Sequence, residues 1–328
     1  MNGENILVVE DEWAVTKQIC SDLNSFGYKV CSTASTGDEA IRKVEEEMPD
    51  LILMDIVLKG KMDGIEAAKQ IALQSDIPII YLTAYTKPEY IERAKQTKPF
   101  GYLVKPFKEN ELCSNIEMAL HKHRVDKEIK DYLDRLAGCY KGTIKAVSGA
   151  IELRGPYATG HHQRVAKLAQ AIAKEMGLSD FSMEGLLFAA YVYNIGLVSM
   201  PVSIIQDSGK LTGIMLTLYR KYPQYSHDIL EEVDFPWPIA DIVLQHRECW
   251  DGSGFPQGIK GESILIEARI MAVAHALEDL TSNRSYRNAF PLNEALEEVS
   301  SNSGTKYDPD VVTACLRLFR EKGYKMEG

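Results

Sequence analysis

The sequence is poor in several features, and each absence excludes a class of protein. Its six cysteines show no CxxC spacing, so neither a disulfide framework nor a thiolate zinc site is predicted. Acidic residues outnumber basic ones by 47 to 37, and a net charge of −10 argues against nucleic-acid binding. We see no apolar run approaching the roughly 18 residues that span a bilayer. The N-terminus lacks the basic and apolar segments of a signal peptide, so a soluble cytoplasmic protein without a membrane partner is expected.

The first third of the chain predicts an α/β domain. At 328 residues, two domains are the default expectation. Short apolar runs alternate here with amphipathic helical segments, which implies a parallel, doubly wound sheet with helices on both faces. The predicted strands are Ile6–Val9, Lys29–Ser32, Leu51–Met54, Ile79–Leu82 and Gly101–Val104. The predicted helices include Thr16–Phe26, Asp38–Glu47 and Ile65–Gln74.

Polar residues fall at the carboxyl ends of these strands, where the functional crevice of such a sheet lies. Glu10 and Asp11 follow the first strand, and Asp55 follows the third. Three converging carboxylates repel each other and require a cation, and Mg²⁺ is the natural match for oxygen ligands. A carboxylate beside that ion can attack a phosphoryl group and hold it as an acyl phosphate. Thr83 and Lys105, at the ends of the last two strands, would then bind the phosphoryl oxygens. The alternative is a set of unrelated, solvated charges.

Over its whole length this segment resembles the receiver domain of bacterial response regulators. The resemblance rests on ILVVED, LILMDI, MDGIE, YLTA and YLVKPF. It implies that Asp55 is the phosphorylated residue and that Glu10, Asp11 and the Val57 carbonyl hold Mg²⁺ with it. It further implies that Tyr102 is the aromatic switch that repacks on activation. The implied phosphodonor is a sensor histidine kinase.

A long helix is predicted from residue 108 to about 153. Its apolar residues alternate spacings of three and four, as a seam between helices requires. For residues 125–140, a dimerising signalling helix and a helix packed on its own domain remain equal alternatives. Beyond Tyr140, packing on its own domain is favoured. The apolar positions are Val125, Ile129, Leu133, Leu136, Tyr140, Ile144, Val147 and Ile151.

From about residue 142 the chain becomes predominantly helical, and an all-α domain of six or more helices is expected. No regular strand alternation appears there. The predicted helices are Arg164–Met176, Met183–Tyr193, Gly213–Lys221, Ile239–His246, Ala268–Leu280 and Leu292–Ser300. The predicted layout is a first domain at 1–122, a helical linker at 123–141 and a second domain at 142–328.

The second domain resembles the HD-GYP domain, a helical metal-dependent phosphohydrolase that cleaves cyclic di-GMP. The likeness covers the whole segment, from IELRGPYATGH (151–161) through HRECWDGSGFP (246–256) to GTKYDP (304–309). The expected fold class is therefore α/β plus all-α: a (βα)5 doubly wound receiver domain followed by an all-α HD-domain-like helical bundle.

Most of the metal-binding residues of that family are replaced in this sequence. Phenols are poor ligands at neutral pH because their pKa lies near 10, and a guanidinium repels a cation. The resemblance therefore implies that hydrolysis at two metals has been lost. Of the expected ligands, His161 and His246 are present. Tyr193 and Asn194 replace a His-Asp doublet, Tyr222 and Arg247 replace histidines, and His275 replaces an Asp. Leu197 and Phe255 replace a Lys and a Tyr of the same family pattern.

Two features keep other interpretations open. His161, His246 and His275 would suit at most one transition metal such as Zn²⁺, unless each histidine simply packs or forms hydrogen bonds. Arg284 and Arg287 stand where the family holds the nucleotide's phosphates, and arginine binds phosphate without a metal. The alternative is that both arginines cap helices.

Two further histidines carry no predicted role. His162 is expected on the surface. His227 and Asp228 are read as an exposed helical pair rather than as a metal-binding doublet.

Three functions follow from these patterns. The leading one is a response regulator in phosphorelay signalling, whose non-catalytic output domain binds a protein partner. The second is a cyclic di-GMP receptor, and the third is an active phosphodiesterase with a reduced metal site. Mg²⁺ in the receiver is the predicted cofactor, and a homodimer through the linker helix is a hypothesis.

Overall fold

The computed structural model describes residues 3–84, 88–154, 160–206, 211–283 and 287–326. The chain divides into two compact units, residues 1–136 and 137–328. The division falls inside helix α5 (Glu109–Arg154), which contributes residues to both units. It lies within the segment 123–141 that the sequence assigns to a linker.

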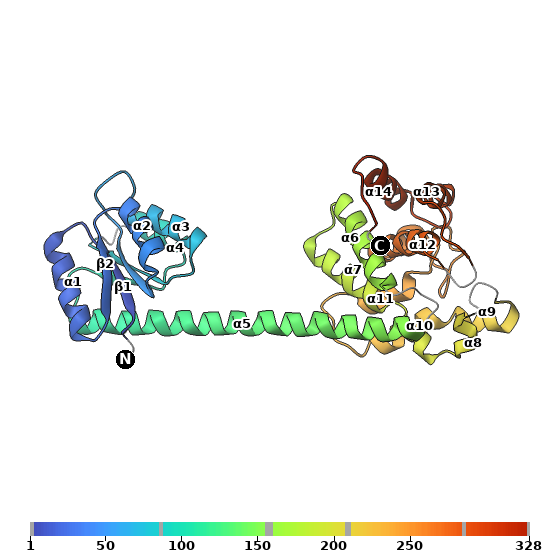
Figure 1. Ribbon diagram of the computed structural model, residues 1–328, viewed down its shortest axis with the longest axis horizontal. Helices are drawn as coiled ribbons and strands as arrows, with labels where there is room; N and C mark the ends of the chain where they lie inside the picture. Colours follow the sequence, from blue (N-terminus) through green and yellow to red (C-terminus); the bar gives the residue numbers. More distant parts are fainter. Residues whose placement is uncertain (1–2, 85–87, 155–159, 207–210, 284–286, 327–328) are drawn as a thin grey trace. The chain divides into compact units, whose positions relative to one another are not determined.

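Unit 1 contains a five-stranded, all-parallel sheet in the order β2-β1-β3-β4-β5 (Figure 1). All five predicted strands are present, and none exceeds its predicted range by more than two residues. The doubly wound α/β fold is therefore confirmed. The strands are β1 (Asn5–Val9), β2 (Lys29–Ala34), β3 (Leu51–Asp55), β4 (Ile79–Thr83) and β5 (Gly101–Val104).

Helices cover both faces of this sheet, because side chains of successive strand residues point to opposite faces. Leu7 and Val9 face one helical layer, and Ile6 and Val8 face the other. The first layer contains α2 (Gly37–Glu47), α3 (Gly64–Gln74) and α4 (Pro88–Lys95). The second contains α1 (Trp13–Ser25) and the first part of α5.

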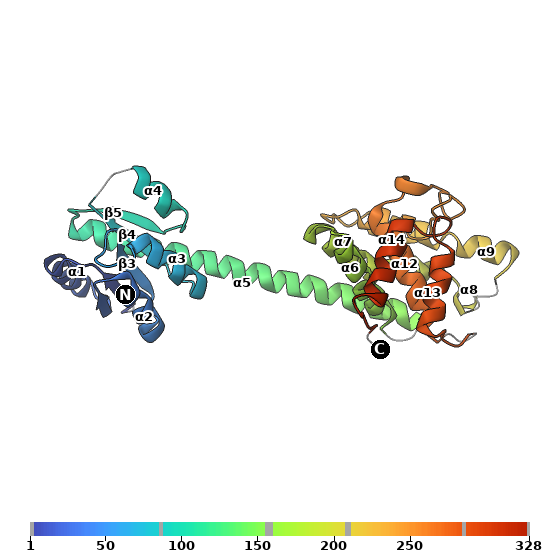
Figure 2. The same ribbon diagram turned by 90° about the horizontal axis from the view of Figure 1, so that it is seen from above.

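Unit 2 is a bundle of helices, as predicted (Figure 2). Its main core joins α6, α7, α11, α12, α13 and α14. The predicted helix ranges do not include α8, α10 or α14, although His227 and Asp228 of α10 were read as a helical pair. The helices are α6 (His161–Glu175), α7 (Asp180–Val192), α8 (Val202–Gln206), α9 (Gly213–Tyr219), α10 (Tyr222–Leu230), α11 (Ile239–Gln245), α12 (Ile266–Thr281), α13 (Leu292–Ser301) and α14 (Pro309–Arg320), with short 3₁₀ turns η1 (Ile195–Ser199) and η2 (Gly261–Ser263).

One prediction from the apolar pattern was wrong. The stretch Asp180–Ser199 has a mean hydropathy of 1.3 and is long enough to cross a bilayer. It forms α7 and η1, and Leu186, Phe188 and Ala189 lie buried in the core of unit 2. The core helix of a globular bundle passes the same length test, so this stretch is weak evidence for a membrane span.

Helix α5 is buried only near its ends. Leu112 and Ile116 pack in unit 1, and Ile144 and Ile151 pack in unit 2. Every residue from 124 to 143 is exposed. The long helix predicted for residues 108 to about 153 is thus present as one element.

Candidate functional site

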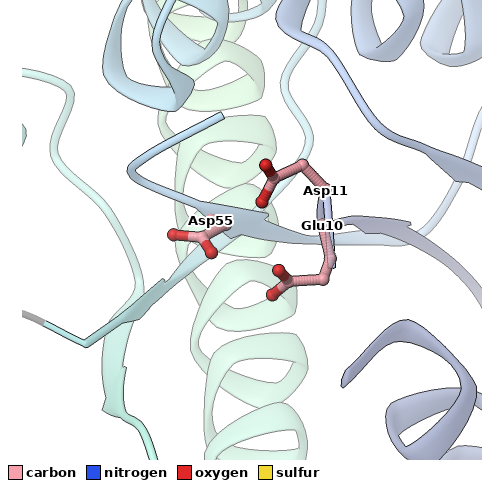
Figure 3. A group of neighbouring side chains, drawn as sticks. All are labelled: Glu10, Asp11 and Asp55. Atoms are coloured by element: carbon pink, nitrogen blue, oxygen red, sulfur yellow. The ribbon is translucent and has the colours of Figure 1, made fainter. Parts of the chain in front are cut away.

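Three carboxylates meet at the carboxyl ends of β1 and β3, as predicted from the strand ends (Figure 3). One oxygen from each of Glu10, Asp11 and Asp55 lies within 4.8 Å of the others. In the described part of the chain, no other group of three His, Cys, Asp or Glu side chains converges this closely. Glu10 and Asp55 are buried, so their charges are poorly screened by water. Three oxygen donors of this kind fit a hard divalent cation.

Lys105 reaches into this cluster from the end of β5. Its ammonium group donates hydrogen bonds to Glu10 and Asp55. Burial lowers the pKa of Lys105, but the hydrogen bonds to the two carboxylates outweigh it, so the pKa lies above its ordinary value. Burial also raises the pKa of Glu10, and the Lys105 hydrogen bond offsets only part of that effect. The crevice therefore pairs a permanent positive charge with the three acids.

The remaining predicted residues of unit 1 surround this crevice. Thr83 is buried at the end of β4. The backbone N–H of Val57 donates to Asp55 Oδ1 at 3.0 Å, which fixes the loop after β3 against the carboxylate. The Tyr102 ring lies against Tyr81 with centroids 5.9 Å apart. The Tyr102 hydroxyl is buried and has no hydrogen-bond partner among the described residues.

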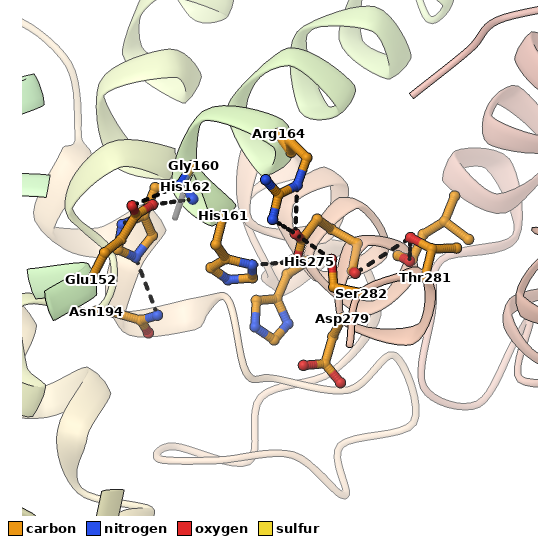
Figure 4. Close-up of polar contacts among 12 residues, drawn as sticks. Glu152, Gly160, His161, His162, Arg164, Asn194, His275, Asp279, Thr281 and Ser282 are labelled. Atoms are coloured by element: carbon orange, nitrogen blue, oxygen red, sulfur yellow. Dashed lines mark hydrogen bonds and ion pairs between the residues drawn. The ribbon is translucent and has the colours of Figure 1, made fainter. Parts of the chain in front are cut away.

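In unit 2, His161 begins α6 and is completely buried (Figure 4). Its Nδ1 forms a hydrogen bond with Glu278, and the hydroxyl of Tyr193 lies 2.6 Å from its Nε2. Arg164 binds the same Glu278 carboxylate through Nε at 2.9 Å and Nη2 at 2.8 Å. Burial alone would raise the pKa of Glu278, but hydrogen bonds from His161, Ser282 and Arg164 bring it to about 2. Both ring nitrogens of His161 are therefore engaged within the protein.

His246 has a parallel set of partners at the end of α11. Its Nδ1–H donates to the Val243 carbonyl, so its Nε2 is the acceptor, and the Tyr222 hydroxyl donates to Nε2 at 2.8 Å. Arg247 Nε donates to the same Tyr222 oxygen at 2.6 Å. Burial, followed by the positive charge of Arg247, lowers the pKa of His246 to about 3. Burial also raises the pKa of Tyr222, which stays a neutral phenol.

The Tyr193 ring lies among the histidines that the sequence nominated as metal ligands. Its centroid is 5.1 Å from that of His246, 5.5 Å from that of His275 and 6.3 Å from that of His161. Arg247 Nη2 lies 3.4 Å from His275 Nε2, which places a fixed positive charge beside the third candidate ligand. A neutral phenol between the imidazoles and a guanidinium beside one of them do not fit a cation site.

The expected surface position of His162 was wrong. Its side chain is completely buried, and Ser148 of α5 hydrogen-bonds to its Nδ1 at 3.0 Å. Glu152 of α5 accepts from the backbone N–H of His162 at 2.8 Å. The first turn of α6 is enclosed by α5 on one side and α12 on the other, so both adjacent histidines face protein. Burial lowers the pKa of His162 to about 3.

Asn194 follows Tyr193 and is also completely buried. Its amide nitrogen lies 3.4 Å from His162 Nε2, and its Oδ1 has no hydrogen-bond partner among the described residues. A single uncharged amide oxygen cannot replace the carboxylate that bridges two cations. The buried Asn194 side chain therefore supplies no charge to balance a cation.

Ser226 of α10 joins that helix to the segment that follows α7. Its hydroxyl donates to the Tyr193 carbonyl at 2.9 Å and accepts from the Gly196 N–H at 2.8 Å. A Cβ at Gly196 would lie 2.2 Å from the Tyr222 carbonyl oxygen, so only glycine permits this approach of α10. Gly196 thus has a packing role.

A cavity of about 330 Å³ lies beside this network. Arg247, His275, Phe255, Lys306 and Tyr307 contribute to its lining.

Arg284 and Arg287 were predicted to bind the phosphates of a nucleotide. Arg284 lies outside the described residues. Arg287 donates to the carbonyls of Asp279 at 2.7 Å and Leu280 at 3.0 Å, near the end of α12. These bonds are what the helix-capping alternative expects.

Of the pair His227–Asp228, which was predicted to be exposed, only one residue is exposed. Asp228 is exposed, whereas the His227 side chain is 17% exposed and lies 3.6–3.8 Å from Asp228, Glu231 and Asp241.

Sequence reasoning missed the buried ion pair between Arg164 and Glu278. A signal was available, because Arg164 follows His161 by three residues and Glu278 follows His275 by three. Residues three apart share a helix face, so each charge was placed to enter the same interior as its histidine.

We expect Glu278→Gln to destabilise unit 2 by about 3 kcal/mol, because it leaves Arg164 without its buried counter-charge. Chemical denaturation of the full chain, followed by near-ultraviolet circular dichroism, measures this loss. Glu294→Gln removes an exposed carboxylate from α13 and should change stability by less than about 0.5 kcal/mol. Equal effects of the two substitutions would contradict the assigned role of the pair.

Comparison with known proteins agrees with this architecture. Residues 145–311 match the HD domain family, and residues 6–117 match the response regulator receiver domain. A cyclic di-GMP phosphodiesterase of Thermotoga maritima is 29% identical over 337 aligned residues, covering 96% of this chain and 90% of the relative. The cyclic di-GMP phosphodiesterase response regulator RpfG of Xanthomonas campestris pv. campestris is 29% identical over 340, covering 96% and 88%.

A third relative matches about half of this chain. The 3'3'-cGAMP-specific phosphodiesterase 3 of Vibrio cholerae is 29% identical over 171 residues, covering 52% of this chain and 37% of the relative. The HD-family match spans half of the chain, and the receiver match precedes it. The chain belongs to the HD domain family and is a response regulator, with a receiver domain followed by an HD-type output domain.

Proposed function

We propose that Asp55 accepts a phosphoryl group from a sensor histidine kinase in the cytoplasm. We further propose that the output domain acts without hydrolysis, by binding a protein partner. The observation that supports the second part most directly is the pairing of Tyr193 with His161 and of Tyr222 with His246. In both pairs a phenol takes the imidazole nitrogen that a metal would need.

The crevice of unit 1 supports the first part. Glu10, Asp11 and Asp55, with the Val57 carbonyl, would hold Mg²⁺, which supplies positive charge beside the attacking carboxylate. Lys105 is placed to neutralise the incoming phosphoryl oxygens, and Thr83 to hydrogen-bond them. A cavity of about 940 Å³, lined by residues of α1 and of the β5–α5 loop, adjoins Lys105 and leaves room for a donor. Tyr102, with its unpartnered buried hydroxyl, is the side chain that we expect to move.

The donor set of unit 2 supports the second part. His161, His246 and His275 keep their imidazoles, but Tyr193 lies among them and Arg247 adds a fixed charge. Two of the three expected single-metal ligands are therefore engaged by phenols, and we propose that this domain holds no transition metal.

Cyclic di-GMP recognition is the second candidate, because two relatives that span most of this chain are named cyclic di-GMP phosphodiesterases. In this case the dinucleotide would be bound as a signal, or cleaved at a reduced site containing at most one metal. Binding would require Arg287 to give up its bonds to the carbonyls of Asp279 and Leu280.

Elemental analysis of the full chain, purified without chelator, tests the proposal. We expect transition metal at less than about 0.2 per chain, because no set of free imidazole ligands is available. The same preparation is then incubated with cyclic di-GMP and Mn²⁺ or Fe²⁺, and no linear dinucleotide should appear. About one metal per chain, with linear product lost in His246→Ala plus His275→Ala, would refute the non-hydrolytic output.

Calorimetric titration with cyclic di-GMP separates the two non-hydrolytic alternatives. Absence of heat at high micromolar ligand agrees with a protein partner. Saturable binding that is weakened by Arg287→Ala would instead support the receptor.

A further inference from the structure

Helix α5 carries an exposed stripe that repeats every seven residues. The stripe consists of Val125, Ile129, Tyr132, Leu136 and Cys139, spaced alternately by four and three. The first four side chains are 36%, 53%, 63% and 48% exposed, and Cys139 is exposed as well. A mean spacing of 3.5 residues is the period of the contact between two helices that supercoil around each other.

The two units bury other sides of the same helix. With Val125 and Tyr132 at heptad position d, and Ile129 and Leu136 at position a, the buried apolar residues of α5 fall at positions b and e, and the buried Ser148 falls at position f. The buried apolar residues are Leu112, Ile116 and Ala119 in unit 1 and Ile144 and Ile151 in unit 2. Tyr140, at position e, packs on Phe188 with ring centroids 5.0 Å apart.

From Met118 to Ala150 the a and d positions stay exposed even where α5 packs on its own unit. Met118 is 61% exposed in unit 1. Thr143, Ala146 and Ala150 are exposed in unit 2, and their small side chains would let another helix approach closely. The uncovered stripe therefore extends over more than four heptads.

The exposed part of α5 lacks the support that a helix normally receives. Every residue from 124 to 143 is exposed, and Tyr140 is the one residue among them for which a packing contact has been described. A helix with so little tertiary packing is marginal in water. Gly138 and Gly142, with open space around them, weaken the helix further. Covering the apolar stripe would supply the missing stabilisation.

We propose that α5 of a second copy of this chain covers the stripe, in a parallel, in-register coiled coil from Met118 to Ala150. In this register, position g of one copy meets the following position e of the other. The pairs are His121 with Asp126, Glu128 with Leu133, Arg135 with Tyr140, and Gly142 with Val147, and none sets like charges against each other. Lys122 at position a would select register at some cost in stability.

Sedimentation equilibrium of the full chain at micromolar concentration tests the partner. The expected mass is twice the 36.7 kDa of one chain. Ile129→Glu with Leu136→Glu should return the mass to that of one chain. The matched control, Lys130→Glu with Ala137→Glu, shifts both changes by one residue to position b and should remain dimeric.

Native Cys139 tests the register without altering the stripe. It is the one exposed cysteine of the six, and all six lie in the described residues. In the proposed register two Cys139 residues face each other at position d, at the Cα separation of about 4.4–6.8 Å that a disulfide needs. Mild oxidation should give a covalent dimer on a non-reducing gel, and Cys139→Ser should lose the cross-link but keep the doubled mass.

Three results would overturn the proposal. These are a single-chain mass for the unmodified protein, a dimer that persists in Ile129→Glu with Leu136→Glu, and a dimer in which Cys139 does not cross-link. Thermal unfolding of each variant confirms that the units remain folded, so a mass change can be assigned to the helix.

Discussion

Asp55→Asn is expected to reduce phosphorylation by a small acyl phosphate such as acetyl phosphate at least about 100-fold, because an amide is not a nucleophile. The substitution preserves the side chain's size, and the Asn oxygen can still accept from the Val57 N–H, so the loop after β3 should remain in place. Intact-mass spectrometry of the full chain with Mg²⁺ present measures the phosphorylated fraction directly.

Asp50→Asn is the matched control. Asp50 lies just before β3, at the opposite end of the strand from Asp55, where it accepts a hydrogen bond from the Asn5 N–H at 2.7 Å. It should be phosphorylated like the unmodified chain. Full phosphorylation of Asp55→Asn would show that another group in the crevice is the acceptor.

The second large effect is expected from restoring the metal ligands of unit 2. A variant with Tyr193→His, Asn194→Asp, Tyr222→His and Arg247→His should raise the transition-metal content from below about 0.2 to at least about one per chain. The substitutions remove the phenols that engage His161 and His246, and they remove the guanidinium charge beside His275. Elemental analysis after purification without chelator gives the count.

A control for this variant changes two tyrosines that pack near Tyr222 but for which no hydrogen bond to the candidate ligand histidines is described. Tyr219→His with Tyr225→His adds two imidazoles nearby on α9 and α10, and we expect it to remain free of metal. A four-substitution variant that folds but binds no metal would show that the side chains removed were not what prevents binding. Protection of its thermal midpoint by added Mn²⁺ or Zn²⁺ would provide a second readout of occupancy.

The strands and the receiver crevice could be predicted because they depend on short-range pattern. Apolar runs bounded by turn residues locate a buried strand, and parallel strands deliver the residues at their carboxyl ends to one crevice. Asp55, Glu10 and Asp11 follow from that rule alone. The same rule says nothing about where the Lys105 ammonium binds, and its contacts with two of the acids required the structure.

The interior of unit 2 was harder to predict, because the role of each side chain depends on which side chains of other helices it contacts. The substituted letters Tyr193 and Tyr222 were visible, but their pairing with His161 and His246 depends on helix packing. Helical periodicity cannot show that α5 and α12 enclose both sides of the first turn of α6, so His162 was misplaced. Short helices such as α8 lack the length that makes an amphipathic period recognisable.

The phenol–imidazole pairs in unit 2 have a consequence for metal supply in the cell. In this domain, tyrosine hydroxyls hydrogen-bond to the buried imidazoles, so the domain does not need to bind an ion before it folds. A chain whose folding free energy includes metal binding does need one. We therefore expect the steady-state amount of this protein to stay constant when iron or manganese is scarce. Its response to phosphorylation would then depend on Mg²⁺ in the receiver crevice but not on the cell's supply of iron or manganese.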